Sequence, residues 1–210
     1  MVQPDRYEDQ IRALEKHPVH QGKVLLYGSS FFAHWGYERA KMHWMQIGGL
    51  EIVNHGFGGA TVQELLYYYD RMVKPYRPGA VVFRTGLNDV GSGLDAQQSI
   101  AQTRALFDRI KEDFPGIPLV ALQVFDTPWA ADKNVAQFHS YNDKLKELAL
   151  SDPAVQTVDL DPFFYRSGAD IGTFRNFRDV FISDGLHLTD SGYERMAQYL
   201  IPEVKKRLMA

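Results

Sequence analysis

The sequence predicts an α/β fold in which helices cover both faces of a central, five-stranded parallel sheet, a three-layer α/β/α arrangement. Short apolar runs alternate with longer amphipathic stretches along the whole chain, which is the pattern of repeated strand–helix units. The short runs are continuously apolar and β-branched, as strands buried on both faces require. No linker, repeat or low-complexity stretch interrupts the 210 residues, so we expect a single domain over residues 1–210.

Five apolar runs are expected to form the strands of this sheet. The first reads Val-Leu-Leu-Tyr, and the third, Ala-Val-Val-Phe, is equally apolar throughout. A Pro-Gly-Ile-Pro stretch gives a clear stop before the fourth run. The predicted strands span residues 24–27, 51–54, 80–83, 119–124 and 155–158.

The amphipathic stretches between the runs predict helices. The clearest case is residues 133–150, where Phe138, Tyr141 and Leu145 recur at three- and four-residue spacing and form one apolar stripe. A cluster of capping residues that starts at Thr189 marks the beginning of the last helix. The predicted helices cover residues 61–74, 94–114, 133–150 and 190–208, and residues 1–20 are expected to form an N-terminal helical extension.

The composition excludes several classes of site and partner. The chain has no cysteine, which excludes a disulfide scaffold, a thiolate metal site and a cysteine nucleophile. Its 23 basic and 26 acidic residues give a net charge of −3, without the basic face that nucleic-acid-binding proteins carry. No apolar run reaches the roughly 18 to 20 residues that cross a bilayer, and no signal peptide is recognisable. We therefore expect a cytoplasmic protein with no nucleic-acid partner and no stable membrane association. The lack of cysteine would also suit an exported protein whose signal had been removed, and a homo-oligomer is compatible with the sequence.

Polar residues follow the predicted strands at the edge where open α/β sheets bind ligands. A serine pair at residues 29–30 follows the first strand, a glycine-rich turn containing Gly59 follows the second, and Asn88 follows the third. Asp184 and His187 precede the last helix. Taken singly, each of these features is ordinary turn or helix-cap chemistry. Together they place a hydroxyl, a glycine turn, an amide and an Asp/His pair at one rim.

The order of these motifs resembles that of the SGNH hydrolases, or GDSL-type hydrolases, a family of esterases and acylhydrolases with a flavodoxin-like α/β/α fold. The matching motifs are Gly-x-Ser, Asn-x-Gly-x-x-Gly, Gly-x-Asn-Asp and Asp-x-x-His, in this order along the chain. The resemblance extends from about Val24 to Tyr199. It is greatest for the bacterial branch whose first motif reads Gly-Ser-Ser followed by a tryptophan, here Trp35.

The resemblance implies a role for each matching residue. Ser30 takes the place of the nucleophile, and Asp184 and His187 complete a catalytic triad. The oxyanion hole is expected from Ser30, Gly59 and Asn88. These residue types suit acyl transfer, because a serine hydroxyl needs a base, and an imidazole with a pKa of about 6.5 takes and returns its proton near neutral pH.

The first motif departs from the family at two positions. Ser29 stands where the family has aspartate, and Phe31 stands where it has leucine. Ser30 is retained, so the nucleophile is present, whereas the chain lacks the aspartate that normally supplies hydrogen bonds at this position. Ser29 is the alternative nucleophile.

The expected activity is that of a serine esterase or acylhydrolase, which cleaves carboxylic esters of small or carbohydrate-borne acyl groups through an acyl-enzyme intermediate. Its expected partner is a small-molecule ester substrate, with no cofactor and no metal. A lysophospholipase or thioesterase is the alternative within the enzyme class, and a non-catalytic flavodoxin-like ligand-binding module is the alternative outside it. A dinucleotide site is disfavoured, because the glycine-rich turn follows the second strand and lacks the last glycine of that fingerprint.

Three aromatic residues near predicted strand ends are candidates for substrate binding: Trp35, Phe57 and Trp129. Core packing is the alternative for each of them. Arg84, just before the Thr-Gly of the third motif, has two interpretations as well. It either pairs with an acidic residue or meets an anionic substrate.

Overall fold

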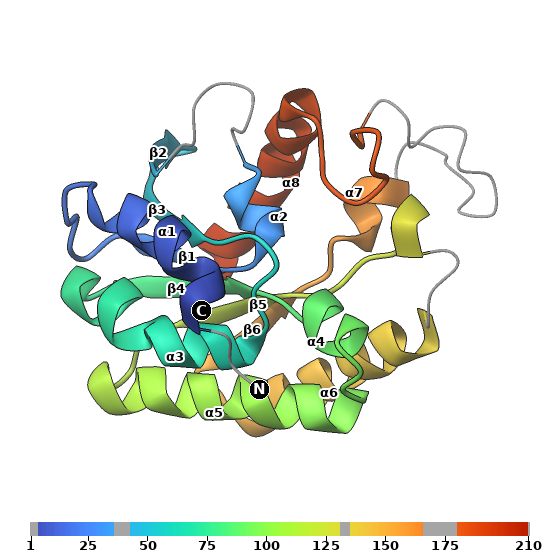
Figure 1. Cartoon of the computed structure of the whole chain (residues 1–210), viewed down its shortest axis with the longest axis horizontal. Helices are drawn as coiled ribbons and strands as arrows, with labels where there is room; N and C mark the ends of the chain where they lie inside the picture. The colour runs from blue at the N-terminus through green and yellow to red at the C-terminus, as the bar shows by residue number, and fades with distance from the viewer. Residues whose placement is uncertain (1–3, 36–42, 131–134, 166–179, 210) are drawn as a thin grey trace.

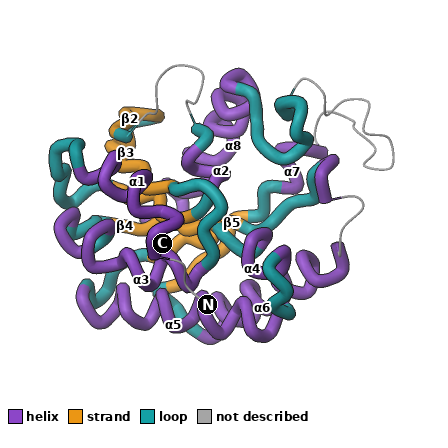
Figure 2. The backbone as a smooth tube through the Cα atoms, in the orientation of Figure 1, coloured by secondary structure: helices purple, strands orange, loops and turns teal. Residues whose placement is uncertain are grey.

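The structure is a computed structural model that describes residues 4–35, 43–130, 135–165 and 180–209. A sheet lies at its centre with helices on both sides, as the ribbon in Figure 1 and the backbone tube in Figure 2 show. This arrangement confirms the predicted α/β class. Among the described residues, none of the helices is both long enough and apolar enough to cross a membrane.

The sheet has the strand order β2-β3-β1-β4-β5-β6, and all neighbours except β2 and β3 are parallel. The five predicted strands are β1, β3, β4, β5 and β6, to which the structure adds β2. The strand bounds are β1 Val24–Gly28, β2 Trp44–Ile47, β3 Leu50–Gly56, β4 Ala80–Arg84, β5 Leu119–Leu122 and β6 Val155–Val158.

The additional strand, β2, pairs antiparallel with β3 at one edge of the sheet. It has only four residues, and Trp44 and Gln46 are exposed, so it lacks the continuous apolar run that predicts the other strands. Gly48 and Gly49 both have positive φ, 57° and 80°, and form the tight turn into β3. Two such residues in succession match the right-handed twist of a hairpin.

The predicted helices at residues 61–74, 94–114, 133–150 and 190–208 correspond to α3, α5, α6 and α8 within a few residues, and residues 133–134 of the third lie outside the described residues. Thr189 begins α8 by accepting a hydrogen bond from the backbone N–H of Gly192 at 3.0 Å. The helix bounds are α1 Pro4–Glu15, α2 Ser30–Ala33, α3 Val62–Met72, α4 Leu87–Gly91, α5 Ala96–Asp113, α6 Val135–Ser151, α7 Asp161–Tyr165 and α8 Asp190–Leu208, with 3₁₀ turns η2 Lys74–Tyr76 and η3 Pro128–Ala130.

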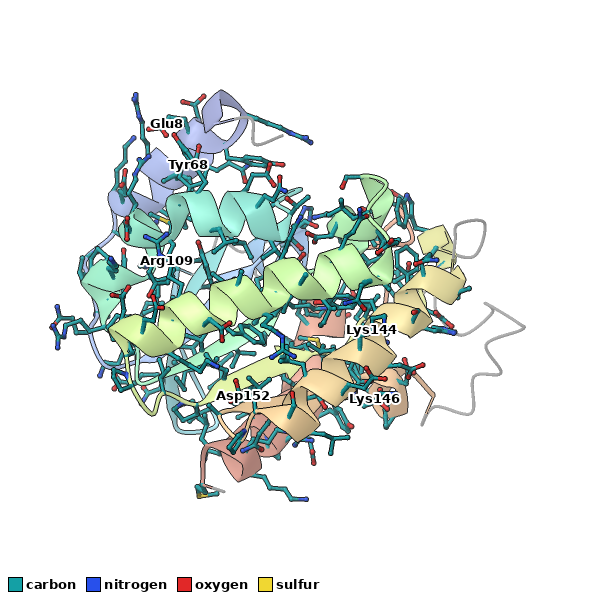
Figure 3. The ribbon with its side chains drawn as sticks, turned by 90° about the horizontal axis from the view of Figure 1, so that it is seen from below. Glu8, Tyr68, Arg109, Lys144, Lys146 and Asp152 are labelled. Carbon is teal, nitrogen blue, oxygen red and sulfur yellow. The ribbon has the colours of Figure 1, made fainter. Side chains whose placement is uncertain are left out.

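The helices divide into two layers because alternate strand residues face opposite sides of the sheet. Leu25 and Tyr27 of β1 belong to the hydrophobic cluster beneath α1, α3, α5 and α6. Val24 and Leu26 belong to the cluster beneath α2 and α8. Figure 3 shows the first layer from below, with α5 running between α3 and α6. Each buried side chain of this size stabilises the fold by about 1.5–3 kcal/mol.

The N-terminal helix α1 is fastened to α3 on the first layer. Arg71 of α3 forms ion pairs with Glu8 and Glu15 of α1, at 2.8 and 2.7 Å. Tyr7 and Ile11 on the same helix are buried in the core. The helix therefore lies beside the segment that leaves β3, which matters for the site described next.

Candidate active site

The three central strands end at the same level. Gly28 at the end of β1 pairs with Gly56 of β3 on one side and with Arg84 of β4 on the other. The segments that follow these strands, residues 29–30, 57–61 and 85–89, therefore leave the sheet at one rim. This is the edge at which parallel α/β sheets bind ligands.

Ser30 is the first residue of the short helix α2, and Ser29 precedes it as the N-cap. Ser29 is buried and its backbone N–H donates to the carbonyl of Arg84 at 3.2 Å, but its side chain makes no capping hydrogen bond. Asn54 of β3 instead holds the helix by donating to the carbonyl oxygen of Phe32 at 2.8 Å. Ser30 is half-buried, and its backbone N–H donates to no other described residue.

Asp184 and His187 form a hydrogen-bonded pair, with 2.6 Å between Oδ2 of the aspartate and Nδ1 of the histidine. The other carboxylate oxygen accepts from the backbone N–H groups of Leu186 and His187, at 2.8 and 2.9 Å. Partial burial raises the pKa of Asp184, but these hydrogen bonds outweigh it, so the pKa lies below its ordinary value. The aspartate is therefore a stable anion that fixes the proton of His187 on Nδ1.

The opposite ring nitrogen of His187, Nε2, is buried and accepts no hydrogen bond. The ring stacks on His34, with centroids 3.9 Å apart and planes inclined by 8°. His34 follows α2, and its backbone N–H donates to the carbonyl of Ser30 at 2.9 Å. His187 thus packs against the residue that follows the helix begun by Ser30, and no hydrogen bond joins the side chains of Ser30 and His187 in this structure.

Gly59 and Asn88, the other two predicted oxyanion-hole residues, both line one groove on the surface. Gly59 has a φ of +82°, which favours glycine, and its carbonyl accepts a hydrogen bond from the hydroxyl of Tyr7 at 2.8 Å. Its backbone N–H donates to no described residue. The side-chain amide of Asn88 donates to the carbonyl of Ala60 at 2.9 Å, which orients the amide while one of its N–H bonds remains.

Asp89 is a structural residue of the site that sequence reasoning missed. It is fully buried, and its carboxylate accepts hydrogen bonds from the backbone N–H of Val62 at 2.9 Å, from that of Gly86 at 3.2 Å, and from the hydroxyl of Thr85. Burial raises its pKa. These bonds join the turn that carries Asn88 to the start of α3. The Asn-Asp pair in the sequence was the available signal.

The aromatic candidates separate into three locations. Phe57 does not line the rim, in contrast to the prediction, because its ring is 0% exposed and packs against Tyr7 and Tyr68 in the core. Trp35 is also buried and borders a different cavity of about 700 Å³ beside α8. Trp129 is 37% exposed and lines the groove that contains Gly59 and Asn88.

Arg84 forms no ion pair with an acidic residue among those that the structure describes, so the first of its two interpretations is wrong. Its guanidinium is buried over the rings of Phe31 and Phe125, with centroids 4.0 and 4.7 Å away, and Nε and Nη2 have no hydrogen-bond partner. Burial lowers its pKa to about 10. It does not line the groove that contains Gly59 and Asn88.

The groove beside Gly59 and Asn88 has a volume of about 550 Å³. Its walls come from α1, the start of α3, α4 and η3. The backbone N–H of Trp129 donates to the carbonyl of Gly185 at 3.0 Å, which ties one wall to the loop between Asp184 and His187. Over the described ranges, no three His, Asp or Glu side chains are grouped so that they could hold a metal ion.

The model of the GDSL-like lipase/acylhydrolase family matches residues 26–195. Among solved structures, a candidate platelet activating factor from Streptococcus pneumonia is similar with a TM-score of 0.74 and 18% identity, over 96% of this chain and 92% of that one. A GDSL-like lipase from Bacteroides thetaiotaomicron is similar with a TM-score of 0.67 and 19% identity, over 96% of this chain and 97% of that one. A carbohydrate esterase family 3 protein from Talaromyces cellulolyticus is similar with a TM-score of 0.63 and 15% identity, over 90% of this chain and 99% of that one. These likenesses show the fold. No curated protein sequence matches the chain.

Proposed function

Because the chain belongs to the GDSL-like lipase/acylhydrolase family and is a hydrolase of ester bonds, we propose that it is a serine esterase in which Ser30, His187 and Asp184 act as the triad. The observation that carries the proposal is that Asp184 binds one ring nitrogen of His187 while the other is buried without a hydrogen-bond partner. Asp184 holds the proton on Nδ1, so Nε2 is the acceptor that a general base requires. A buried acceptor without a partner costs about 1–3 kcal/mol, which a purely structural histidine would avoid.

In the proposed reaction, Oγ of Ser30 attacks the carbonyl carbon of the ester while its proton passes to Nε2 of His187. The carbonyl π electrons move to oxygen, and the resulting oxyanion accepts hydrogen bonds from the backbone N–H groups of Ser30 and Gly59 and from the amide of Asn88. Collapse of the tetrahedral intermediate breaks the bond to the alcohol, which takes the proton from Nε2. Water then attacks the acyl-serine by the same steps and releases the acid.

The absence of a hydrogen bond between Ser30 and His187 is compatible with this mechanism. Catalytic hydrogen bonds are often long or poorly aligned without substrate and shorten in the complex. His34 supports the arrangement, since its ring covers one face of His187 from the turn that follows α2. The N–H groups of Ser30 and Gly59, which donate to no described residue, are available to an oxyanion.

The proposed substrates are carboxylic esters of small or carbohydrate-borne acyl groups. The groove beside Gly59 and Asn88 is lined largely by polar side chains together with Trp129, which suits a polar alcohol better than a long alkyl chain. The likeness to a carbohydrate esterase is in keeping with this choice.

The test is hydrolysis of 4-nitrophenyl acetate by the wild type, Ser30→Ala and Ser29→Ala. We expect Ser30→Ala to lose at least about 10³-fold in kcat, because the nucleophile is removed, and Ser29→Ala to retain most of the activity. A fluorophosphonate should label Ser30, as mapped by mass spectrometry. Equal hydrolysis by the wild type and Ser30→Ala, or labelling at Ser29, would overturn the assignment.

A further inference from the structure

The groove beside Gly59 and Asn88 adjoins the place where the ester carbonyl lies in the proposed reaction. Its volume of about 550 Å³ is that of a small-molecule site. One wall is the N-terminal helix α1, which no part of the proposed chemistry uses. A substrate group next to the ester carbonyl can therefore enter the groove and contact α1.

Trp129 provides a flat apolar surface among polar groups. Trp129 as a whole residue is 37% exposed, and it lines the groove together with Thr61, Gln63 and Ser92. The backbone bond from Trp129 to Gly185 holds this residue next to the loop of the proposed base. A large rigid ring flanked by hydrogen-bonding side chains suits a ligand with an apolar face and a polar edge, which describes a sugar ring.

Arg6 brings a positive charge to the same groove from α1. Nη2 of its guanidinium lies 3.5 Å from the point where a Cβ on Gly59 would be, and the group lies 5.2 Å from the ring centre of Tyr7. It forms no ion pair with any residue that the structure describes. By contrast, Arg12 on the same helix pairs with Glu8 at 2.8 Å. The planar donors of Arg6 are thus available to a ligand.

Glu64 is the acidic residue of the groove lining, and its carboxylate is already engaged. Oε2 accepts the backbone N–H of Thr61 at 2.9 Å and the hydroxyl of the same residue, which caps α3, and the residue is buried. The backbone N–H of Val62 at the start of α3 donates to the carboxylate of Asp89 at 2.9 Å, so this helix end is already capped by two acidic side chains. An anionic ligand group in the groove would therefore meet Arg6, the basic residue of its lining.

We propose that the groove binds the alcohol part of the ester and that this part is a saccharide carrying a carboxylate, an inference that rests on the proposed function. Arg6 recognises the carboxylate through paired N–H donors, which match the spacing of its two oxygens. Trp129 stacks on the sugar ring. Arg6 from α1 and Trp129 from η3 are then specificity-determining residues of the groove, and the substrate class is an acylated uronic-acid saccharide.

The decisive experiment compares two acetylated substrates that differ only at C6: an O-acetylated methyl glucuronoside and the matching methyl glucoside. We expect the wild type to prefer the acidic substrate by about five- to tenfold in kcat/KM at low ionic strength, as a charged hydrogen bond at a partly exposed site implies. Arg6→Gln should abolish this preference, mainly through KM, because the contact does not change during the reaction. Arg12→Gln makes the same change of charge on the same helix and should retain it.

Three results would overturn the proposal. The first is no preference for the glucuronoside in the wild type. The second is equal loss of preference in Arg6→Gln and Arg12→Gln, which would assign it to the general field of α1. The third is a preference that appears on the acyl side, as faster hydrolysis of 4-nitrophenyl succinate than of 4-nitrophenyl butyrate that depends on Arg6.

A binding measurement separates this proposal from the proposed function. The indole N–H signal of Trp129, assigned by Trp129→Phe, is followed by NMR while unacetylated methyl glucuronoside or methyl glucoside is added. We expect the glucuronoside to shift the signal at lower concentration than the glucoside, and Arg6→Gln to remove the difference. This result holds or fails whether or not Ser30 proves to be the nucleophile. Equal titrations by the two sugars would contradict the role of Arg6.

Discussion

We expect two buried histidines apart from the proposed triad, His43 and His55, to make the fold sensitive to mild acid. Nδ1 of His55 lies 2.7 Å from the carbonyl oxygen of Met72, so this nitrogen carries the proton and donates it. Nε2 of His55 is then an acceptor, and it lies 3.2 Å from Nε2 of His43, which must be the donor. A second proton on His55 would set two donors against each other.

The size of the effect follows from the pKa values in the two states. Burial lowers the pKa of His55 to about 3 and that of His43 to about 4. The unfolded chain titrates both at about 6.5, so it binds more protons than the folded protein below that pH. The stabilisation is therefore complete above about pH 6.5 and is lost as the pH falls toward the folded values. At about pH 5 each histidine has lowered the free energy of unfolding by roughly 2 kcal/mol. The whole free energy of unfolding of a domain is typically about 5–15 kcal/mol.

The variant His55→Asn isolates one of these contributions, because asparagine places an N–H donor where Nδ1 lies and does not titrate. Urea unfolding is measured for the wild type and the variant at about pH 8 and about pH 5. We expect the wild type to lose about 2 kcal/mol more stability over this interval than the variant does. Asp161, whose pKa burial raises to about 6, gains stability over the same interval, but equally in both proteins.

If the two proteins lose the same free energy of unfolding to within about 0.5 kcal/mol, His55 is not held neutral by its surroundings and the argument is wrong. Unchanged m-values in the two proteins establish that the same surface unfolds.

Three further changes test the site and its supports. Asn88→Ala should lower kcat on 4-nitrophenyl acetate by about 10²- to 10³-fold, the effect of removing one oxyanion donor, and an unchanged kcat would exclude Asn88 from the reaction. Asp184→Asn should lower kcat by up to about 10⁴-fold, because the imidazole loses its fixed tautomer, and a loss below about tenfold would contradict the triad. Gly86→Ala should destabilise the fold by about 1–3 kcal/mol in urea unfolding, since φ is +109° and a Cβ would lie 2.7 Å from the Tyr141 ring; Gly91→Ala, which has open space, is the matched control and should not.

The parallel strands and long helices could be predicted because buried positions carry apolar residues: continuous runs in the strands, and residues at three- and four-residue spacing in the helices. The runs at β1 and β4 are apolar throughout, as strands covered on both faces must be. β2 could not be predicted in this way, since its outward residues are exposed at the edge of the sheet. Phe57 was misjudged for a related reason: its backbone N–H donates to Gly28, which turns the segment after β3 back into the core.

Within the site, residues close in sequence were the easier part. The three-residue spacing of Asp184 and His187 suffices for their hydrogen bond. The contact between Tyr7 and Gly59 joins residues 52 positions apart and depends on how α1 lies on α3, which no local pattern records. The same holds for the stacking of His34 on His187, which requires both loops to be in place.

The proposed nucleophile and base come from opposite ends of the chain, and this has a consequence for folding. The hydroxyl of Tyr193 in α8 donates to the carbonyl of Phe31 in α2 at 2.6 Å, across 162 residues of sequence. Contacts of such high separation close large loops and belong to the slow part of folding. Recovery of esterase activity during refolding should therefore lag behind recovery of helical circular dichroism. Turnover would then report the last event of folding, the docking of α8, rather than the formation of the sheet.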